Sequence, residues 1–222
     1  MDLAIVVHTI DKYSFLWEGW YYFFRKYWDF SINARLVFMN EDVEVSFPGI
    51  DQVRTGPGEW SDRLKRGLEM LPESNVFYMQ EDFWPIETLP RKYFEKAFGL
   101  FVRKKMDAFR ITWMGNYRLF PMPHMLGGQL VYRFRNKSSM YLITHQSGFW
   151  RKDFFLDCLA PDESPWKNEI EGTERVRATM RPRVYMVKRK WYEEVCRRGE
   201  LTAAGQAMMR EVRNSHTVQS TS

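Results

Sequence analysis

Residues 75–82 read Asn-Val-Phe-Tyr-Met-Gln-Glu-Asp, a short apolar run that ends in two adjacent carboxylates. A continuous apolar run of this length, bounded by polar residues, is typical of a buried strand in a parallel sheet. Glu81 and Asp82 would then lie at the carboxyl end of the strand, where open α/β sheets bind their ligands. The stretch predicts both a central strand and a ligand site at its end.

The sequence on either side of this strand predicts strands and helices in alternation. Further strands are expected at 3–7 and 34–39, and helices at 13–28, from 61 onward and from 90 onward. This order favours an α/β fold with a doubly wound, mostly parallel sheet. The second half is expected to add mixed or antiparallel strands, at 108–113, 117–120, 129–134, 140–144 and 183–187.

The chain of 222 residues shows neither an internal repeat nor a low-complexity linker, so a single domain is expected over residues 1–213. Its two halves divide near residue 106. A terminal helix is expected over 200–213, and the polar residues 214–222 are expected to form a flexible tail.

The composition is that of a globular protein, with 45% hydrophobic and 27% charged residues, and this excludes a disordered chain. The net charge of +5 suits an anionic partner such as a nucleotide, an anionic glycan, nucleic acid or acidic lipid, without choosing among them. Cys158 and Cys196 lack metal-site spacing and are expected to be reduced, which favours a cytoplasmic protein. No signal peptide or transmembrane segment is predicted.

Two neighbouring carboxylates flanked by apolar residues are costly unless their charge is compensated. A hard divalent cation, Mg²⁺ or Mn²⁺, would compensate Glu81 and Asp82 and would in turn hold a diphosphate. Alternatively, Glu81 caps a helix and Asp82 pairs with an arginine. Arg63 lies in the first turn of the helix that precedes the strand, where an anionic ligand is favoured.

Residues 77–84, Phe-Tyr-Met-Gln-Glu-Asp-Phe-Trp, resemble a variant of the Asp-x-Asp metal motif of GT-A-type glycosyltransferases. The order of the later segments His145-Gln146, 149–152 and 165–169 is similar to that of small bacterial and phage members, and the resemblance spans roughly residues 3–175. This sequence lacks a literal Asp-x-Asp. Either Glu81 or Asp82 could therefore be the metal ligand, with Asp82 favoured by analogy.

The resemblance implies a GT-A-like fold whose first half, about residues 1–106, binds the nucleotide. It implies that Thr9 and Asp11 contact the base or ribose of a nucleotide-sugar donor, with Arg63 and Glu81 near its phosphates. Trp60 would line the same pocket. The alternative for the tryptophan is core packing.

The second half, about residues 107–213, would form the acceptor side. An inverting transferase needs a general base for the acceptor hydroxyl, and Glu169 is the candidate. Trp166, three residues earlier, would offer a flat face to a sugar or base, with Gln146 and Trp150 beside it. His145 would complete the metal shell or bind a phosphate; a structural role is the alternative for each of these residues.

Three functions are therefore expected from the sequence. The first is metal-dependent sugar transfer from a nucleotide sugar to a hydroxyl of a glycan. The second is the same chemistry on a hydroxylated or hydroxymethylated base of phage DNA. The third is a non-catalytic module that binds a nucleotide or a sugar. The carboxylates show no second set spaced for a two-metal nuclease.

Overall fold

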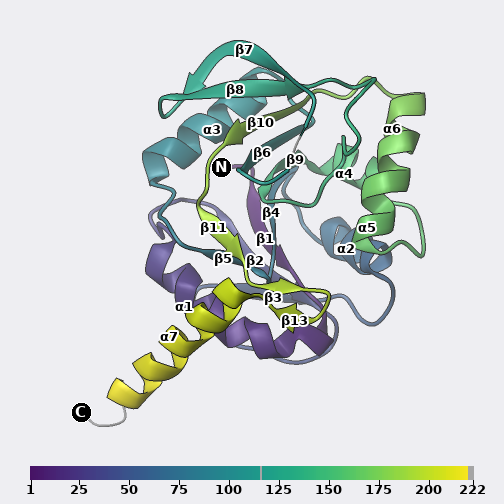
Figure 1. Cartoon of the computed structure of the whole chain (residues 1–222). Coiled ribbons are helices and arrows are strands. Elements are labelled where there is room, and N and C mark those ends of the chain that lie inside the picture. The colour runs from purple at the N-terminus through teal and green to yellow at the C-terminus, as the bar shows by residue number, and fades with distance from the viewer. Residues whose placement is uncertain (116, 220–222) are drawn as a thin grey trace.

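A computed structural model describes residues 1–115 and 117–219. Within these residues the largest sheet has nine strands, in the order β3-β2-β1-β4-β9-β6-β10-β8-β7 (Figure 1). In chain order these are β1 (Ala4–His8), β2 (Arg35–Asn40), β3 (Asp51–Arg54), β4 (Asn75–Gln80), β6 (Ala108–Thr112), β7 (Leu119–Leu126), β8 (Gln129–Phe134), β9 (Gly148–Arg151) and β10 (Val184–Lys188).

The strand directions confirm the predicted fold class. Strands β3, β2, β1 and β4 are parallel to one another, and β6 is parallel to β10. β9 runs antiparallel to both of its neighbours, β4 and β6. At the other end of the sheet, β8 is antiparallel to β10, and β7 is antiparallel to β8. The sheet is thus mostly parallel in the first half and mixed in the second.

Helices cover both faces of this sheet. α1 (Trp17–Tyr27) and α3 (Arg91–Arg103) pack on one face, and α2 (Trp60–Glu69), α4 (Lys152–Cys158) and α6 (Thr173–Thr179) on the other (Figure 1). The alternation of side chains along β1 feeds both cores: Ile5 and Val7 join the first, and Ala4 and Val6 the second. Burial on both sides explains why the strand sequences are continuously apolar.

Two strands of the nine-stranded sheet, β3 and β9, were not expected from the sequence, and neither were the four short strands outside it. One predicted strand is absent. Residues 140–144, expected as a strand, form an irregular loop that packs Leu142 and Ile143 into the core. Their apolar character reflects burial of two side chains, which a buried loop and a strand share.

Short strands bring the C-terminal part of the chain next to the segment that follows Glu81 and Asp82. β5 (Phe83–Pro85) pairs with β11 (Tyr192–Glu194), and β12 (Cys196–Arg197) forms a hairpin with β13 (Glu200–Leu201). The remaining elements are the 3-10 helix η1 (Asp11–Leu16), α5 (Pro165–Lys167), the π-helical turn η2 (Asn168–Gly172) and α7 (Ala203–Gln219).

The terminal helix begins and ends later than expected. α7 continues to Gln219, so residues 214–219 are helical, and residues 220–222 lie outside the described part of the chain. Across residues 1–115 and 117–219, no helix combines the length and the apolar character that a bilayer crossing requires.

Candidate active site

Parallel pairing brings the ends of β1, β2 and β4 to one edge of the sheet. His8 is in register with Gln80 of β4 and Met39 of β2. The backbone of Thr9 donates a hydrogen bond to Met39 O at 2.9 Å. Thr9 and Glu81, the next residues of β1 and β4, therefore start the loops that surround the site.

The backbone of the acidic pair is fixed from two sides. Trp84 Nε1 donates to Glu81 O at 2.9 Å, and the backbone N–H of Val195 donates to Asp82 O at 2.8 Å. Val195 belongs to the C-terminal segment, more than a hundred residues away in sequence. The turn that presents the carboxylates is thus held by a contact that the sequence alone does not reveal.

The two carboxylates lie in a poorly solvated environment. Burial raises the pKa of Glu81 well above its usual value, and the neighbouring charge of Asp82 raises it further. Burial raises the pKa of Asp82 to about 7, and repulsion from Glu194 acts in the same direction. Asp82 Oδ1 is buried without a hydrogen-bond partner.

The alternative in which Asp82 pairs with an arginine is wrong, because no ion pair of Glu81 or Asp82 exists among the residues that the structure describes.

A cavity of about 340 Å³ joins the acidic pair to the predicted acceptor residues. Gln80, Glu81 and Asp82 form one wall. The predicted residues on the other side are His145, Gln146, Trp166 and Glu169. The structure therefore brings together groups that lie as much as 89 positions apart in sequence.

A second hollow of about 290 Å³ adjoins this cavity and contains the predicted donor residues Thr9, Trp60 and Arg63. Glu81 and Trp166 line both hollows, so the two form a continuous cleft. His8 also lines the second hollow. Burial lowers its pKa well below the usual value, so its imidazole is neutral. His8 was not predicted as a site residue, although its position at the end of the β1 strand was a usable signal.

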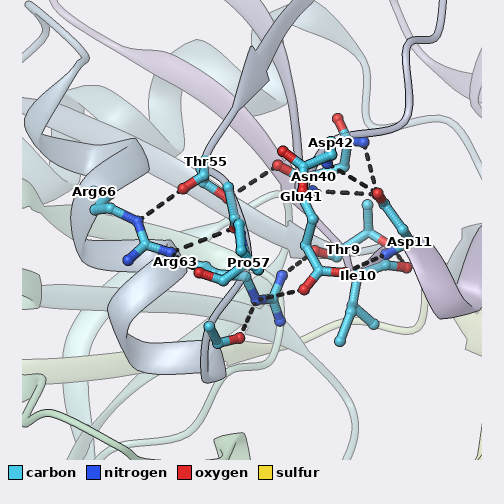
Figure 2. A network of polar contacts seen from close by, with 12 residues as sticks. Thr9, Ile10, Asp11, Asn40, Glu41, Asp42, Thr55, Pro57, Arg63 and Arg66 are labelled. Carbon is cyan, nitrogen blue, oxygen red and sulfur yellow. Dashed lines mark hydrogen bonds and ion pairs between the residues drawn. The ribbon is translucent and has the colours of Figure 1, made fainter.

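Asp11 contacts protein groups rather than the cleft (Figure 2). Its carboxylate accepts hydrogen bonds from Asn40 Nδ2 and from the backbone N–H groups of Glu41, Asp42 and Val43, at 2.8–3.2 Å. Burial raises its pKa, but these four hydrogen bonds outweigh the effect and lower it overall. Four bonds use the acceptor positions of a carboxylate, so Asp11 orders the loop after β2 instead of offering a free oxygen to a ribose.

Arg63 links the two loops that border the donor hollow (Figure 2). Its Nη1 donates to Thr9 O at 2.6 Å and its Nε to Gly58 O at 3.0 Å, while Glu41 lies 3.7 Å from Nε. The side chain is only 3% exposed. Arg63 thus fixes the shape of the hollow, in addition to placing a positive charge beside it.

His145 is held in one tautomer by its neighbours. Asn168 Nδ2 donates to Cys158 O and to Glu163, so Asn168 Oδ1 is the atom that faces His145 Nε2, at 3.0 Å. An amide oxygen accepts, so Nε2 carries the proton and the lone pair lies on Nδ1, which is buried without a partner. Burial lowers the pKa of His145 to about 3, and Arg110 lowers it in the same direction.

Glu169 lies on the π-helical turn η2, and such turns are frequent at functional sites. Its Oε1 accepts from the backbone N–H of His145 at 2.8 Å. Burial raises its pKa, which that hydrogen bond partly offsets. A carboxylate with a raised pKa that lines a cavity can accept a proton near neutral pH.

The two predicted acceptor tryptophans differ completely in exposure. Trp166 is 62% exposed and borders both hollows, as expected for a residue that stacks on a ligand. The assignment of Trp150 to the acceptor site is wrong. Its ring is fully buried on β9 and stacks on Phe155, with ring centroids 4.2 Å apart, so it belongs to the core.

The β12–β13 hairpin supplies a wall that the sequence analysis missed. Its two-residue turn, Arg198-Gly199, has φ values of 55° and 86°, which is the left-handed pattern of a type I′ hairpin turn. The turn places Arg197 and Arg198 beside the cavity that holds the acidic pair. An Arg-Gly dipeptide between two short strands was the available signal.

The residues of the cleft could hold a cation only if oxygens of a bound phosphate compound or of water complete its coordination. Across the described residues, no group of three or more His, Cys, Asp or Glu side chains is placed to hold a metal, so His145 and the acidic pair form no such set. The unpartnered Oδ1 of Asp82 next to Glu81 nevertheless fits a cation of the Mg²⁺ type, which takes one or two protein carboxylates plus phosphate and water oxygens.

No family model matches the sequence, and no curated protein matches it either. Solved structures do match. Residues 1–349 of S. aureus TarS in complex with UDP-GlcNAc have a TM-score of 0.56 at 14% identity, over 96% of this chain and 65% of that one. The chain spans only 36% of a longer TarS structure.

Two further structures match over nearly their whole lengths. UDP-glucose pyrophosphorylase complexed with UDP-glucose has a TM-score of 0.56 at 10% identity, over 99% of this chain and all of the other. CMP:2-keto-3-deoxy-manno-octonic acid synthetase complexed with CTP has a TM-score of 0.53 at 12% identity, over 96% and 99%. The chain therefore has the fold of proteins that handle nucleotide sugars and nucleotides.

Proposed function

We propose that the protein is a glycosyltransferase that moves a sugar from a nucleotide-sugar donor to a hydroxyl of a glycan. The observation that carries this proposal is the single cavity in which the acidic pair meets Glu169 and Trp166. The acidic pair suits a cation-bound diphosphate, Glu169 suits proton transfer, and Trp166 suits a sugar ring. The matched fold, found in structures complexed with UDP-GlcNAc and UDP-glucose, supports the same donor class.

The donor is assigned to the continuous cleft. The nucleoside would occupy the hollow lined by Thr9 and Trp60. Trp60 is only 6% exposed and packs in the core, so it would form the floor of this hollow and not a free stacking face. The diphosphate would lie between the acidic pair and the hairpin turn, close to Arg198. Arginine recognises phosphate oxygens by charge-assisted hydrogen bonds.

A divalent cation is proposed as the group that joins donor and protein. Asp82, with Glu81 beside it, would provide the protein ligands, because Oδ1 of Asp82 has no other partner. When bound, the cation would neutralise charge on the departing diphosphate. His145 is not proposed as a ligand, because among the described residues it forms no metal-binding group with the acidic pair. Its bonds to Asn168 and Glu169 instead support the loop next to Glu169.

In the proposed reaction the acceptor oxygen attacks the anomeric carbon of the donor sugar. The bond from that carbon to the diphosphate breaks, the nucleoside diphosphate leaves, and the hydroxyl proton passes to the Glu169 carboxylate. The raised pKa of Glu169 brings its basicity closer to that needed at neutral pH. This assignment corresponds to an inverting transferase with one general base.

The matched fold also occurs in a pyrophosphorylase and a CMP-sugar synthetase, so the products must distinguish glycosyl from nucleotidyl transfer. The test is a thermal-shift screen of nucleoside diphosphates and nucleotide sugars with and without Mn²⁺, followed by product analysis. We expect stabilisation by a nucleoside diphosphate only when Mn²⁺ is present. The incubated nucleotide sugar should yield the nucleoside diphosphate.

Formation of a nucleoside triphosphate from the nucleotide sugar and pyrophosphate would overturn the proposal in favour of nucleotidyl transfer. Binding without any turnover would favour the non-catalytic module. The absence of a shift with every nucleotide would contradict both.

A further inference from the structure

Acidic residues are missing from one long segment of the chain. No aspartate or glutamate occurs from Ala108 to Lys152, although the whole chain contains 28 acidic residues. This segment forms β6, β7, β8 and β9 and the loops between them. Its basic residues are Arg110, Arg118, Arg133, Arg135, Lys137, Arg151 and Lys152. The surface that this segment builds therefore contains basic side chains and no acidic side chain of its own.

Three of these cations have structural partners. Arg110 is fully buried and donates to the carbonyls of Leu142 and Thr144, Arg151 pairs with Asp107 at 2.5 Å, and Lys152 Nζ donates to a backbone carbonyl. The other four lie on the β7–β8 hairpin and its adjoining loops. In the described part of the chain none of these four forms an ion pair with a carboxylate: Arg118, Arg133, Arg135 and Lys137.

Two hollows connect this basic surface to the catalytic cavity. A middle hollow of about 530 Å³, lined by Tyr117, Arg118 and Tyr141, shares Gln146 and Glu169 with the catalytic cavity.

An outer hollow of about 420 Å³ is lined by Phe120, Arg135 and Lys137, and it shares Ser138 with the middle one. The three hollows therefore form a track that starts at the proposed general base and ends on β8. We call it the acceptor track.

Aromatic and cationic side chains lie together along the track. The guanidinium of Arg135 lies 4.0 Å from the ring centre of Phe120, and Phe120 is 48% exposed. Exposed aromatic faces pack against sugar rings, and unpaired guanidinium and ammonium groups bind carboxylates or phosphates. Phe120 belongs to neither core cluster.

We propose that the acceptor is an anionic glycan chain, whose reactive hydroxyl lies beside Glu169 and whose neighbouring charged units occupy the acceptor track. This inference rests on the proposed sugar transfer and names its acceptor class. The three hollows adjoin one another from Glu169 to β8, which suits a flexible single chain that can follow them. The unpaired cations provide charge complementarity to such a chain.

The test is direct binding, measured without donor, by fluorescence anisotropy. The probes are labelled carboxymethyl dextran, neutral dextran of equal length, and an oligo-dT matched in charge. The variant Arg118→Gln/Arg135→Gln/Lys137→Gln removes three cations of the track. The matched control Lys92→Gln/Lys96→Gln/Lys104→Gln removes three exposed cations on or next to α3 and leaves the same net charge.

The track variant should bind carboxymethyl dextran about tenfold more weakly than the unmodified chain, since each surface charge contact contributes about two- to threefold. Its affinity should also depend less steeply on NaCl between about 50 and 200 mM. The control should retain most of the affinity. Neutral dextran should bind more weakly than carboxymethyl dextran to the unmodified chain.

Equal losses in the two variants, or equal binding of neutral and anionic dextran, would overturn the acceptor track. Tighter binding of oligo-dT than of carboxymethyl dextran would assign the track to single-stranded nucleic acid instead. The nucleotide and Mn²⁺ thermal shift of the track variant serves as an independent readout. If that shift is absent from the unmodified chain while dextran binding follows the expectation, the proposed donor chemistry fails and the track stands.

Discussion

Replacing Asp82 by asparagine should stabilise the protein without its ligands, and should do so increasingly as the pH rises. The folded-state pKa of Asp82 is about 7, against an ordinary value of 3.8. A carboxyl group whose pKa is raised by folding binds its proton more tightly in the folded state. Its contribution to stability is therefore complete below about pH 4 and is lost as the pH rises through about 7.

The magnitude follows from the difference between the two pKa values. A difference of about 3 pKa units corresponds to roughly 4 kcal/mol of folding free energy at pH 8. Asparagine avoids the charge but leaves a polar amide in the same poorly hydrogen-bonded position, which costs about half of this amount. Asp82→Asn should therefore be about 2 kcal/mol more stable at about pH 8, and the difference should shrink towards about pH 5.

The assay is urea unfolding in the presence of EDTA over this pH range, with Asp157→Asn, an exposed carboxylate on α4, as the matched control. Asp157→Asn should show no comparable pH-dependent gain. The reasoning is refuted if Asp82→Asn is less stable than the unmodified chain at about pH 8, or if their difference does not change with pH. The same variant should lose the Mn²⁺-dependent stabilisation by a nucleoside diphosphate, which separates a binding role from a purely structural one.

Four further substitutions test other parts of the structure. Glu169→Gln should lower kcat by about 10²- to 10⁴-fold with little change in the KM for the donor, measured by release of the nucleoside diphosphate, and an unchanged kcat would exclude Glu169 as the base. Trp166→Ala should raise the KM for the acceptor while chemical unfolding shows a stability change under about 1 kcal/mol, because this side chain is largely exposed. Trp150→Ala should instead destabilise the fold by about 3–5 kcal/mol, and a milder loss in the same unfolding assay would contradict its core position. Asp11→Ala should destabilise by about 2 kcal/mol or more and weaken donor binding indirectly, since it leaves the backbone N–H groups of the loop after β2 unpaired; calorimetry of folding and of nucleotide binding would show whether both effects occur.

Several elements and their ends were predictable because they depend on local sequence. The apolar runs of β1, β2 and β4 are continuous, so each predicted a buried strand, and β4 has the predicted bounds Asn75–Gln80. The Ser164-Pro165 dipeptide also caps a helix as such pairs do, with Ser164 Oγ accepting from Lys167 N. Local signals of this kind need no knowledge of partners.

Other features depended on partners that are distant in sequence. β9 lies between β4 and β6, in the middle of the sheet, yet its four residues carry no period that distinguishes a strand from a helix start. The opposite exposures of Trp150 and Trp166 could not be inferred from the sequence, because the residue type alone does not tell whether a tryptophan packs in a core or borders a cavity.

The α/β order of elements and the acidic pair at the end of a buried strand follow from hydrophobic periodicity and residue type, which are local properties of the chain. The groups that face this pair are set by the folding of the whole chain. Folding brings Glu169, Trp166 and the Arg198-Gly199 turn to the same cavity. It also fixes the tautomer of His145 and places backbone N–H groups against the carboxylate oxygens of Asp11. Burial and hydrogen bonding raise or lower the pKa and the reactivity of a side chain. The groups responsible are brought beside that side chain by folding, whatever their distance along the sequence.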